Sequence, residues 1–347
     1  MKILLIGYYG RNNLGDDLML ENLVFMIKKI KPDCKISVAL HNINTMPGQL
    51  ENTIRIDTSD KVKYIKNIIS SDIVVWGGGT CFYDAGETKI TRGLNDLIKI
   101  AIVCKLFNTK LIFLGVGIGK VTDRIKNKIK TIFNYSHSLY FRDEESFSEG
   151  HNYTKKKLYR SGDLALLGNI EKFSSNEKKY VTYSGVYNYA INTQHLAWLL
   201  DDLSRETNTE IAFLPCHRAP HDDNEHHQNV ANLLNVKYTI FDTNTIDEYL
   251  QILSCSQFHI GVRLHSIVLS DMLAIPNVGV EYSPKIKKYI KSTNVLFEDR
   301  SNPRVEDISI NKIKNIIKNY VRPTEYINGE NKLSLIAIER VINDLGI

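Results

Sequence analysis

The sequence has few cysteines and no long apolar run. Its five cysteines are scattered through 347 residues, and no two of them form a Cys-x-x-Cys pair. Scattered thiols are typical of a reducing compartment and exclude a disulfide-rich scaffold. No stretch approaches the roughly 18 apolar residues of a membrane span, and the first ten residues lack the long apolar region of a signal peptide. We therefore expect a cytoplasmic protein, and a place at the inner face of the membrane stays open.

A strong charge excess is also missing. Lys and Arg number 44 against 39 Asp and Glu, a formal net charge of +5. This balance excludes a nucleic-acid-coating protein and suits either a solvated lysine-rich surface or a small anionic ligand. The chain is 43% hydrophobic and 24% charged, as in ordinary globular proteins. At roughly 150 residues per domain, its length predicts two domains.

Short apolar runs alternate with helical periods along the chain, which is typical of doubly wound parallel sheets. Predicted strands in the first half are 2–6, 36–40, 73–76, 111–114, 139–141 and 157–159, and predicted helices are 18–30, 62–69 and 94–106. After a polar stretch the pattern restarts. Predicted strands there are 180–184, 211–214, 238–241, 258–260 and 278–280, and predicted helices are 193–207, 222–234, 246–254, 265–273 and 284–290.

The polar stretch at 169–179 is the best candidate linker. The alternating strands and helices predict an α/β fold. A linker at this place divides it into a first domain over residues 1–172 and a second over 173–328. A C-terminal helix within 329–347 would cap one of them, because apolar residues recur with helical spacing over 332–345. Two such domains would form a cleft, and ligands of these sheets bind outside the carboxyl ends of the strands.

The loops after the first, third and fourth predicted strands are rich in glycine. Residues 7–17 carry Gly10, Asn13, Gly15, Asp16 and Asp17, where a helix N-terminus could meet an anion, although Asn13 and Asp16 could equally be helix caps. The spacing matches neither the dinucleotide fingerprint nor a P-loop. Residues 77–79 include Gly78 and Gly79, and either bring backbone to a ligand or make a packing turn. Residues 115–119 could also be a simple packing turn.

Basic residues follow later predicted strands. Arg142 could bind a carboxylate or phosphate, or be neutralised by Asp143 and Glu144. His217 directly follows a strand and is a plausible ligand-facing residue. The histidines and aspartates between 217 and 227 fit a helix start capped by Asp222 or Asp223 better than a metal site, and no metal is predicted.

The strongest motif joins residues 261–266 with residues 281–285. Arg263 and His265 flank a strand-to-helix turn, and Lys285 lies at the next equivalent turn, beside Glu281. Cations at successive strand ends predict a site for a small, highly charged anion. The alternative is that His265 has a structural role.

Taken in order, these motifs resemble the polysaccharide pyruvyl transferase family. The resemblance runs from about residue 3 to about residue 290 and rests on Gly-Tyr-Tyr-Gly-x-x-Asn-x-Gly-Asp-Asp, Gly-Gly-Gly, Phe-Arg-Asp-Glu-Glu-Ser, Gly-Val-Arg-Leu-His and Tyr-Ser-Pro-Lys. It implies a GT-B-like fold of two Rossmann-like domains. It also implies an enzyme of cell-surface polysaccharide or exopolysaccharide biosynthesis that uses phosphoenolpyruvate as a co-substrate, with no further cofactor.

The implied acceptor is a saccharide or lipid-linked saccharide, and the implied products are a pyruvate ketal and phosphate. By motif position, the residues implied to bind phosphoenolpyruvate are Arg142, Arg263, Leu264, His265 and Lys285. His265 is the candidate general acid, and Asp16 or Asp17 is the candidate base. Residues implied to face the cleft or hold the acceptor are Gly10, Asn13, Gly15, Gly78, Gly79, His217 and Glu281.

Two other functions remain open at this stage. One is a glycosyltransferase of the same fold that uses a nucleotide sugar, although no second carboxylate follows Glu281 at the usual interval. The other is a non-catalytic binding protein. The sugar, the hydroxyl groups modified, a peripheral membrane contact through Lys126, Lys128 and Lys130, and homo-oligomerisation are not specified by any pattern.

Overall fold

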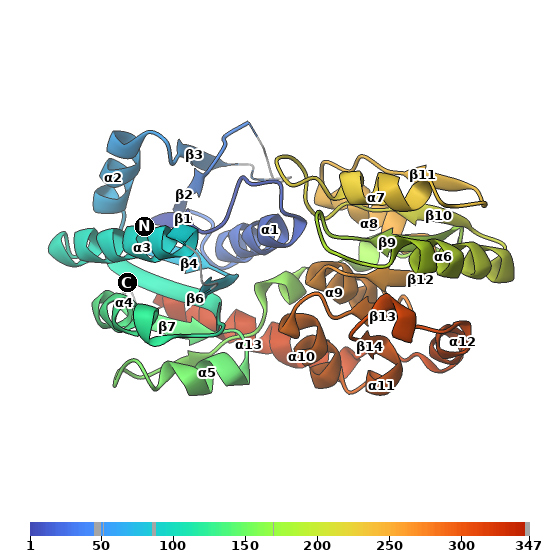
Figure 1. Ribbon diagram of the computed structural model, residues 1–347. Helices are drawn as coiled ribbons and strands as arrows, with labels where there is room; N and C mark the ends of the chain where they lie inside the picture. Colours follow the sequence, from blue (N-terminus) through green and yellow to red (C-terminus); the bar gives the residue numbers. More distant parts are fainter. Residues whose placement is uncertain (45–49, 51, 85–87, 169, 344–347) are drawn as a thin grey trace. The chain divides into compact units, whose positions relative to one another are not determined.

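The computed structural model describes residues 1–347 except 45–49, 51, 85–87, 169 and 344–347. The chain divides into two compact units, each with its own parallel sheet (Figure 1). The N-terminal unit comprises Met1–Arg11, Asp16–Leu167 and Asn328–Ile347. The C-terminal unit comprises Asn12–Gly15 and Gly168–Ile327. The short segment Asn12–Gly15 therefore packs with residues that follow it much later in the sequence.

The sheet of the N-terminal unit has the strand order β3-β2-β1-β4-β6-β7-β8, with β5 paired to β6. All of its strand pairs are parallel. The strands are β1 (Lys2–Ile6), β2 (Lys35–Leu40), β3 (Thr53–Asp57), β4 (Ile73–Gly77), β5 (Thr80–Phe82), β6 (Lys110–Ile118), β7 (Ser138–Phe141) and β8 (Tyr159–Arg160). The order reverses between β1 and β4, which is where doubly wound sheets bind ligands.

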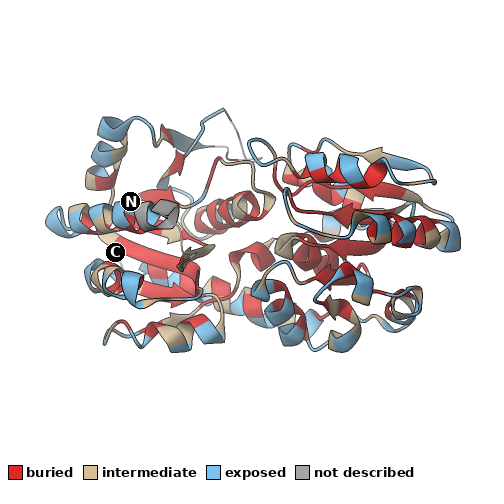
Figure 2. Cartoon of the chain, viewed as in Figure 1, coloured by how far each residue is buried: buried red, intermediate tan, exposed pale blue. Residues whose placement is uncertain are grey.

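Helices cover this sheet because its central strands are apolar on both faces. They are α1 (Leu14–Ile30), α2 (Lys61–Ser70), α3 (Thr88–Leu106), α4 (Asp123–Tyr135), α5 (Glu144–Gly150), the 3-10 helix η1 (Leu164–Leu167) and α13 (Thr324–Asn343). Apolar residues of α2, α3 and α4 pack in one cluster with β1, β4 and β6. Figure 2 shows the strands buried and the helices exposed on their outer faces.

The sheet of the C-terminal unit has the strand order β11-β10-β9-β12-β13-β14, again all parallel. Its strands are β9 (Tyr180–Ser184), β10 (Glu210–Phe213), β11 (Tyr238–Ile240), β12 (Ser256–Gly261), β13 (Asn277–Val280) and β14 (Ser301–Asn302). Read in chain order this is 3-2-1-4-5-6, the arrangement of Rossmann-like domains. Its reversal point lies between β9 and β12.

The helices of this unit follow its strands in turn. They are α6 (Thr193–Thr207), α7 (Asp223–Ala231), α8 (Ile246–Ser254), α9 (Leu264–Met272), α10 (Pro284–Thr293), α11 (Phe297–Arg300) and α12 (Ile310–Asn319), with 3-10 helices η2 (Glu171–Phe173) and η3 (Val305–Asp307). Apolar residues of α6, α7 and α12 form one core cluster with β9, β10, β12 and β13.

The prediction of an α/β fold with two Rossmann-like domains is confirmed, and several local predictions are corrected. The glycine-rich stretch after residue 114 is no turn: β6 continues to Ile118, and a register shift lies between Leu114 and Val116, where Gly115 has a φ of +69°. β3 was not predicted, because this edge strand buries little more than Ile56. α12 was also not predicted.

The boundaries of the units differ from the sequence-based ones. The change of unit falls at Gly168, and Asn328–Ile347 pack with the N-terminal unit. The C-terminal helix α13 starts at Thr324, ahead of the predicted start. Asn169 of the predicted linker and Leu345 of the predicted helix lie outside the described residues.

A buried ion pair links α9 to α11 in the core of the C-terminal unit. Arg300 and Asp271 both have 0% side-chain exposure, and Arg300 Nη2 donates to the two oxygens of Asp271 at 2.6 and 2.8 Å. Tyr320 donates its hydroxyl to Asp271 at 2.8 Å, and Asn277 Oδ1 accepts from Arg300 at 2.8 Å. Because every charge is matched, the pair fixes the end of α9 relative to β13 and α11.

We expect Arg300→Ala to lower the free energy of unfolding of the C-terminal unit by about 3–5 kcal/mol, because it leaves the Asp271 carboxylate buried without its partner. Arg304→Ala is the matched control: Arg304 pairs with Asp307 at an exposed position, where such a pair contributes about 0–1 kcal/mol. Urea unfolding monitors both variants. Equal losses in the two variants would contradict the structural role assigned to the buried pair.

Candidate active site

The loop after β1 and the loop after β4 lie together in the N-terminal unit. Tyr9 is buried, and its hydroxyl donates to the carbonyl oxygen of Gly77 at 2.6 Å. Gly10, Gly78 and Gly79 have φ values of +69°, +75° and +78°. Side-chain-bearing residues rarely adopt this backbone region, so the glycines are needed for the tight turns at the sheet's reversal point.

Two aspartates open α1 against these loops. A Cβ atom added at Gly79 would lie 3.6 Å from Asp16 Oδ1, which places the Asp16 carboxylate against the loop after β4. Asp17 is only 9% exposed. Burial, followed by repulsion from Asp16 and Glu21, raises the pKa of Asp17 to about 8, although a hydrogen bond with the Gly10 backbone opposes the shift. Near neutral pH the Asp17 carboxyl is therefore mostly protonated and can donate a proton.

Arg142 follows β7 at the same edge of this sheet. Its guanidinium donates to Thr80 Oγ1 at 3.1 Å and to Asp143 Oδ2 at 3.3 Å, and it lies 3.8 Å from Asp163 Oδ2. The side chain is 11% exposed. The open alternative, a local ion pair with Asp143, is thus present, and Asp163 adds a second carboxylate that the sequence did not indicate.

In the C-terminal unit, the segment Asn12–Gly15 pairs with the loop after β10. Asn13 forms an antiparallel bridge with His217, Leu14 N donates to Cys216 O at 2.8 Å, and Arg218 N donates to Asn12 O at 3.0 Å. Asn13 Oδ1 also accepts from Gly15 N at 3.1 Å, so Asn13 does cap the start of α1. Backbone hydrogen bonds therefore hold this segment and the His217 loop together.

Gly15 is placed directly against His265. A Cβ atom at Gly15 would overlap the imidazole ring, so the backbone can approach His265 only because residue 15 lacks a side chain. His265 and Leu264 occupy the first turn of α9, and both are partly buried. Arg263 is the N-cap residue of that helix. The predicted pair of Arg263 and His265 thus lies at a helix N-terminus, where backbone N–H groups favour an anion.

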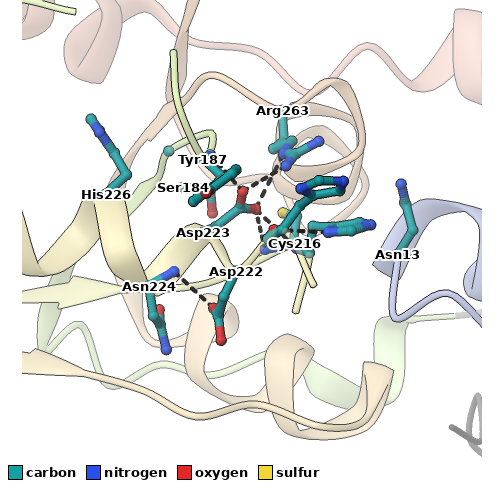
Figure 3. A network of polar contacts seen from close by, with 12 residues as sticks. Asn13, Ser184, Tyr187, Cys216, Asp222, Asp223, Asn224, His226 and Arg263 are labelled. Atoms are coloured by element: carbon teal, nitrogen blue, oxygen red, sulfur yellow. Dashed lines mark hydrogen bonds and ion pairs between the residues drawn. The ribbon is translucent and has the colours of Figure 1, made fainter. Parts of the chain in front are cut away.

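Asp223 connects these loops, as Figure 3 shows. Its carboxylate has 0% exposure and accepts from the backbone N–H groups of Tyr187 at 2.9 Å, Cys216 at 3.2 Å and His217 at 2.9 Å. Arg263 donates to the same carboxylate through Nε at 3.1 Å and Nη2 at 2.5 Å. Burial lowers the pKa of Arg263, but this carboxylate outweighs it and raises the value above the ordinary one.

The predicted helix start is confirmed, with Asp222 rather than Asp223 as its cap, and the histidines nearby make structural contacts. Asp222 is the N-cap of α7, accepting from Asn224 N at 2.9 Å, whereas Asp223 is the first helical residue. His227 Nε2 accepts from Gly185 N at 2.9 Å, and burial puts its pKa well below the ordinary value. Within the described ranges, no group of three or more His, Cys, Asp or Glu side chains is placed to hold a metal ion.

Glu281 and Lys285 lie after β13. Glu281 accepts from Ser301 Oγ at 2.7 Å and lies 3.7 Å from Lys287 Nζ. Lys285 is exposed in the first turn of α10. Between them, Tyr282 packs edge-to-face on Tyr189 with ring centroids 5.1 Å apart, and it contributes to the electrostatic environment of Arg263.

Each unit thus gathers part of the predicted site at the carboxyl ends of its strands. The N-terminal unit joins Asp16 and Asp17 with Gly10, Gly78 and Gly79, and it holds Arg142 beside Thr80. The C-terminal unit joins Asn13, Gly15, His217, Arg263 and His265. The sequence did not indicate that Asp223 is the central residue of this hydrogen-bond network. An aspartate at a helix start predicts a helix cap, and the local sequence does not show whether that aspartate is buried.

Solved structures similar to this chain share its fold. A Listeria monocytogenes protein assigned as a UDP-N-acetylglucosamine 2-epimerase has a TM-score of 0.66 at 9% identity, covering 99% of this chain and 95% of that one. The Neisseria meningitidis UDP-GlcNAc 2-epimerase bound to UDP-GlcNAc has a TM-score of 0.60 at 11% identity, covering 99% of this chain and 100% of that one. The wall teichoic acid polymerase TagF has a TM-score of 0.55 at 11% identity, covering 99% of this chain and 88% of that one. These likenesses show a GT-B-like fold with two Rossmann-like domains.

The sequence itself matches a family model described as polysaccharide pyruvyl transferase over residues 13–284. The matched region begins at Asn13 and includes Arg142, Asp223 and the start of α9. No curated protein sequence matches the chain. In the part of the chain that the structure describes, no helix combines the length and apolar character needed to cross a membrane.

The raised pKa of Asp17 predicts a pH dependence of stability. In the folded protein this carboxyl keeps a proton up to about pH 8, whereas the unfolded chain releases it near the ordinary value of 3.8. Its stabilising contribution is therefore complete below about pH 4 and is lost as the pH rises toward 8, by up to about 1.4 kcal/mol per pH unit.

We expect Asp17→Asn to remove this component, so that the free energy of unfolding falls less between about pH 5 and pH 8 than in the wild type. Urea unfolding at the two pH values measures the difference, with the exposed Asp33→Asn as control. Parallel pH dependences for wild type and Asp17→Asn would show that the carboxyl ionises normally.

Proposed function

Because the chain belongs to the polysaccharide pyruvyl transferase family, a family of transferases, we propose that it transfers pyruvate from phosphoenolpyruvate to a sugar. The sugar belongs to a cell-surface polysaccharide or its lipid-linked precursor, and the product is a pyruvate ketal with release of phosphate. The observation that carries this proposal is the match of the family model across the loops of His217, Asp223 and Arg263. The fold alone does not distinguish this reaction from others that GT-B-like proteins perform.

The chemistry of the donor requires cations and proton transfer. Protonation of the methylene carbon of phosphoenolpyruvate makes C2 electrophilic, and a sugar hydroxyl adds there and loses its proton. Departure of phosphate creates a second electrophile, which a second hydroxyl closes into the ketal. The developing and departing negative charges call for positioned cations and hydrogen-bond donors.

We assign the donor's phosphate and carboxylate to Arg142, Arg263, Leu264, His265 and Lys285. The N-terminus of α9 supports this assignment, since its backbone N–H groups and Arg263 both favour an anion. His265 is the proposed general acid. It lies against the backbone of Gly15, which limits the movement of its ring.

The two aspartates of α1 take different roles in this proposal. Asp17, with a pKa of about 8, holds a proton near neutral pH and is therefore unsuited to act as a base, and Asp16 is the candidate base for a sugar hydroxyl. Gly10, Asn13, Gly15, Gly78, Gly79, His217 and Glu281 are assigned to the acceptor or to the loops around it. Phosphoenolpyruvate is consumed as a substrate, so the scheme calls for no separate cofactor.

Incubation with phosphoenolpyruvate and a panel of sugars, nucleotide-linked sugars and lipid-linked sugars tests the proposed function. We expect phosphate release only with a true acceptor, together with a new ketal methyl signal in the proton NMR spectrum of the product. Thermal shifts compare phosphoenolpyruvate with UDP-GlcNAc as ligands. Stabilisation by UDP-GlcNAc and not by phosphoenolpyruvate would favour a nucleotide-sugar glycosyltransferase and overturn the proposal.

We expect His265→Ala to lower turnover about 10²–10⁴-fold, the usual contribution of a general acid, while the melting temperature stays within about a few degrees of the wild type. His195→Ala in α6 is the control, because the His195 ring packs on Trp198 of the same helix and His195 is not among the predicted site residues. Steady-state phosphate release measures both. A large fall in melting temperature for His265→Ala would assign His265 a structural role.

A further inference from the structure

The two edges of the Arg263 guanidinium have different surroundings. Nε and Nη2 form one edge of this planar group, and both donate to the carboxylate of Asp223. The outer, terminal edge consists of Nη1 and the second N–H of Nη2, and the planar geometry points it away from Asp223. The Arg263 side chain keeps 21% exposure, whereas Asp223 has none. The carboxylate therefore holds the inner edge and sets the direction of the outer one.

Asp223 itself cannot move without breaking several contacts. It accepts three backbone N–H groups, from the loop after β9 and the loop after β10, in addition to the two from Arg263. The Asp223 backbone N–H also donates to His217 O at 2.9 Å. A carboxylate satisfied on both oxygens and fully buried is a rigid support, because any displacement leaves buried donors without an acceptor.

From this geometry we infer that Asp223 is the positioning residue of an oxyanion site, whose ligand is a phosphate or carboxylate group bound by the outer edge of Arg263. A planar fork held along one edge can bind an oxyanion bidentately along the other without first losing side-chain freedom. The inference rests on the proposed function for the identity of the ligand, phosphoenolpyruvate. The positioning role rests on the contacts of Asp223 alone.

Asp223 also supports the surroundings of this site. Cys216 donates its N–H to Asp223 while its carbonyl accepts from Leu14 N, so the carboxylate and the segment Asn12–Gly15 hold the two sides of one peptide loop. Gly15 in turn lies against His265. Loss of the Asp223 charge is thus expected to disturb Arg263 first and the His265 environment second.

A double-mutant cycle tests the inference. The variants are Asp223→Asn, Arg263→Gln and the double variant, and isothermal titration measures their affinities for phosphoenolpyruvate and for inorganic phosphate. If Asp223 acts through Arg263, each single substitution weakens binding at least about tenfold, and the double variant binds no more weakly than the weaker single variant. Losses that multiply in the double variant, or wild-type affinity in Asp223→Asn, would overturn the inference.

Asp201→Asn is the matched control for a purely structural effect. Asp201 is a buried carboxylate of α6 with 4% exposure, and it accepts from the backbone and side-chain nitrogens of Asn235. Its substitution is expected to lower the melting temperature and to leave the affinity for phosphoenolpyruvate within about twofold of the wild type. An equal loss of affinity in Asp201→Asn would reduce Asp223 to a general stabilising residue.

Arg263→Lys keeps the test decisive if Asp223→Asn does not fold. Lysine retains a charge beside Asp223 but has no second planar edge, so we expect the same loss of affinity as in Arg263→Gln. Wild-type affinity in Arg263→Lys would overturn the inference. If the wild-type protein binds phosphate and not phosphoenolpyruvate, the proposed donor alone is refuted. The double-mutant cycle then uses the affinities for phosphate to test the role of Asp223. Failure to bind either anion would overturn both.

Discussion

Burying the Asp223 carboxylate removes a full negative charge from water, and the C-terminal unit compensates with five hydrogen bonds from four residues. Three come from backbone N–H groups and two from Arg263. The free-energy penalty of burying an unmatched charge is far larger than the stabilisation from a single hydrogen bond. The loops after β9 and β10 and the start of α9 therefore all contact the Asp223 carboxylate. This shared contact positions His217 and Arg263 directly, and His265 through its place in the first turn of α9.

The parallel sheets explain why the candidate site lies at strand ends. In both units the strand order reverses next to the first strand, β1 in one and β9 in the other. The loops at such a reversal point diverge, leaving backbone N–H groups and helix N-termini available to a ligand. In the N-terminal unit, glycines with positive φ line this edge. In the C-terminal unit, the network of Asp223 occupies the corresponding place.

Local charge balance shapes the chemistry more than net charge does. Arg263 is matched by Asp223, and Arg142 by Asp143 and Asp163, so neither is an isolated cation. Such pairing keeps guanidinium groups oriented, at the expense of part of their attraction for an anion. Asp17 shows the opposite effect. Burial beside Asp16 and Glu21 raises its pKa to about 8 and makes a carboxyl group a proton donor near neutral pH.

The amino-acid sequence by itself determined the succession of strands and helices, the glycine loops and the motif that carries Arg263 and His265. Strands buried on both faces are continuous apolar runs, and helices carry their own period, so both are visible in a short window. Helix α12, the edge strand β3 and the register shift at Gly115 were not predicted. The edge strand buries little, and the register shift depends on the neighbouring strands of the sheet.

Only the tertiary structure decided what individual polar residues do. Asp222 and Asp223 are adjacent and chemically identical, yet one caps α7 in partial contact with solvent and the other is fully buried against Arg263, forty residues away in the sequence. Likewise Gly15 and His265 meet across 250 positions. Burial and charge pairing arise from contacts between distant segments, and no local pattern encodes which of two equal carboxylates is removed from water.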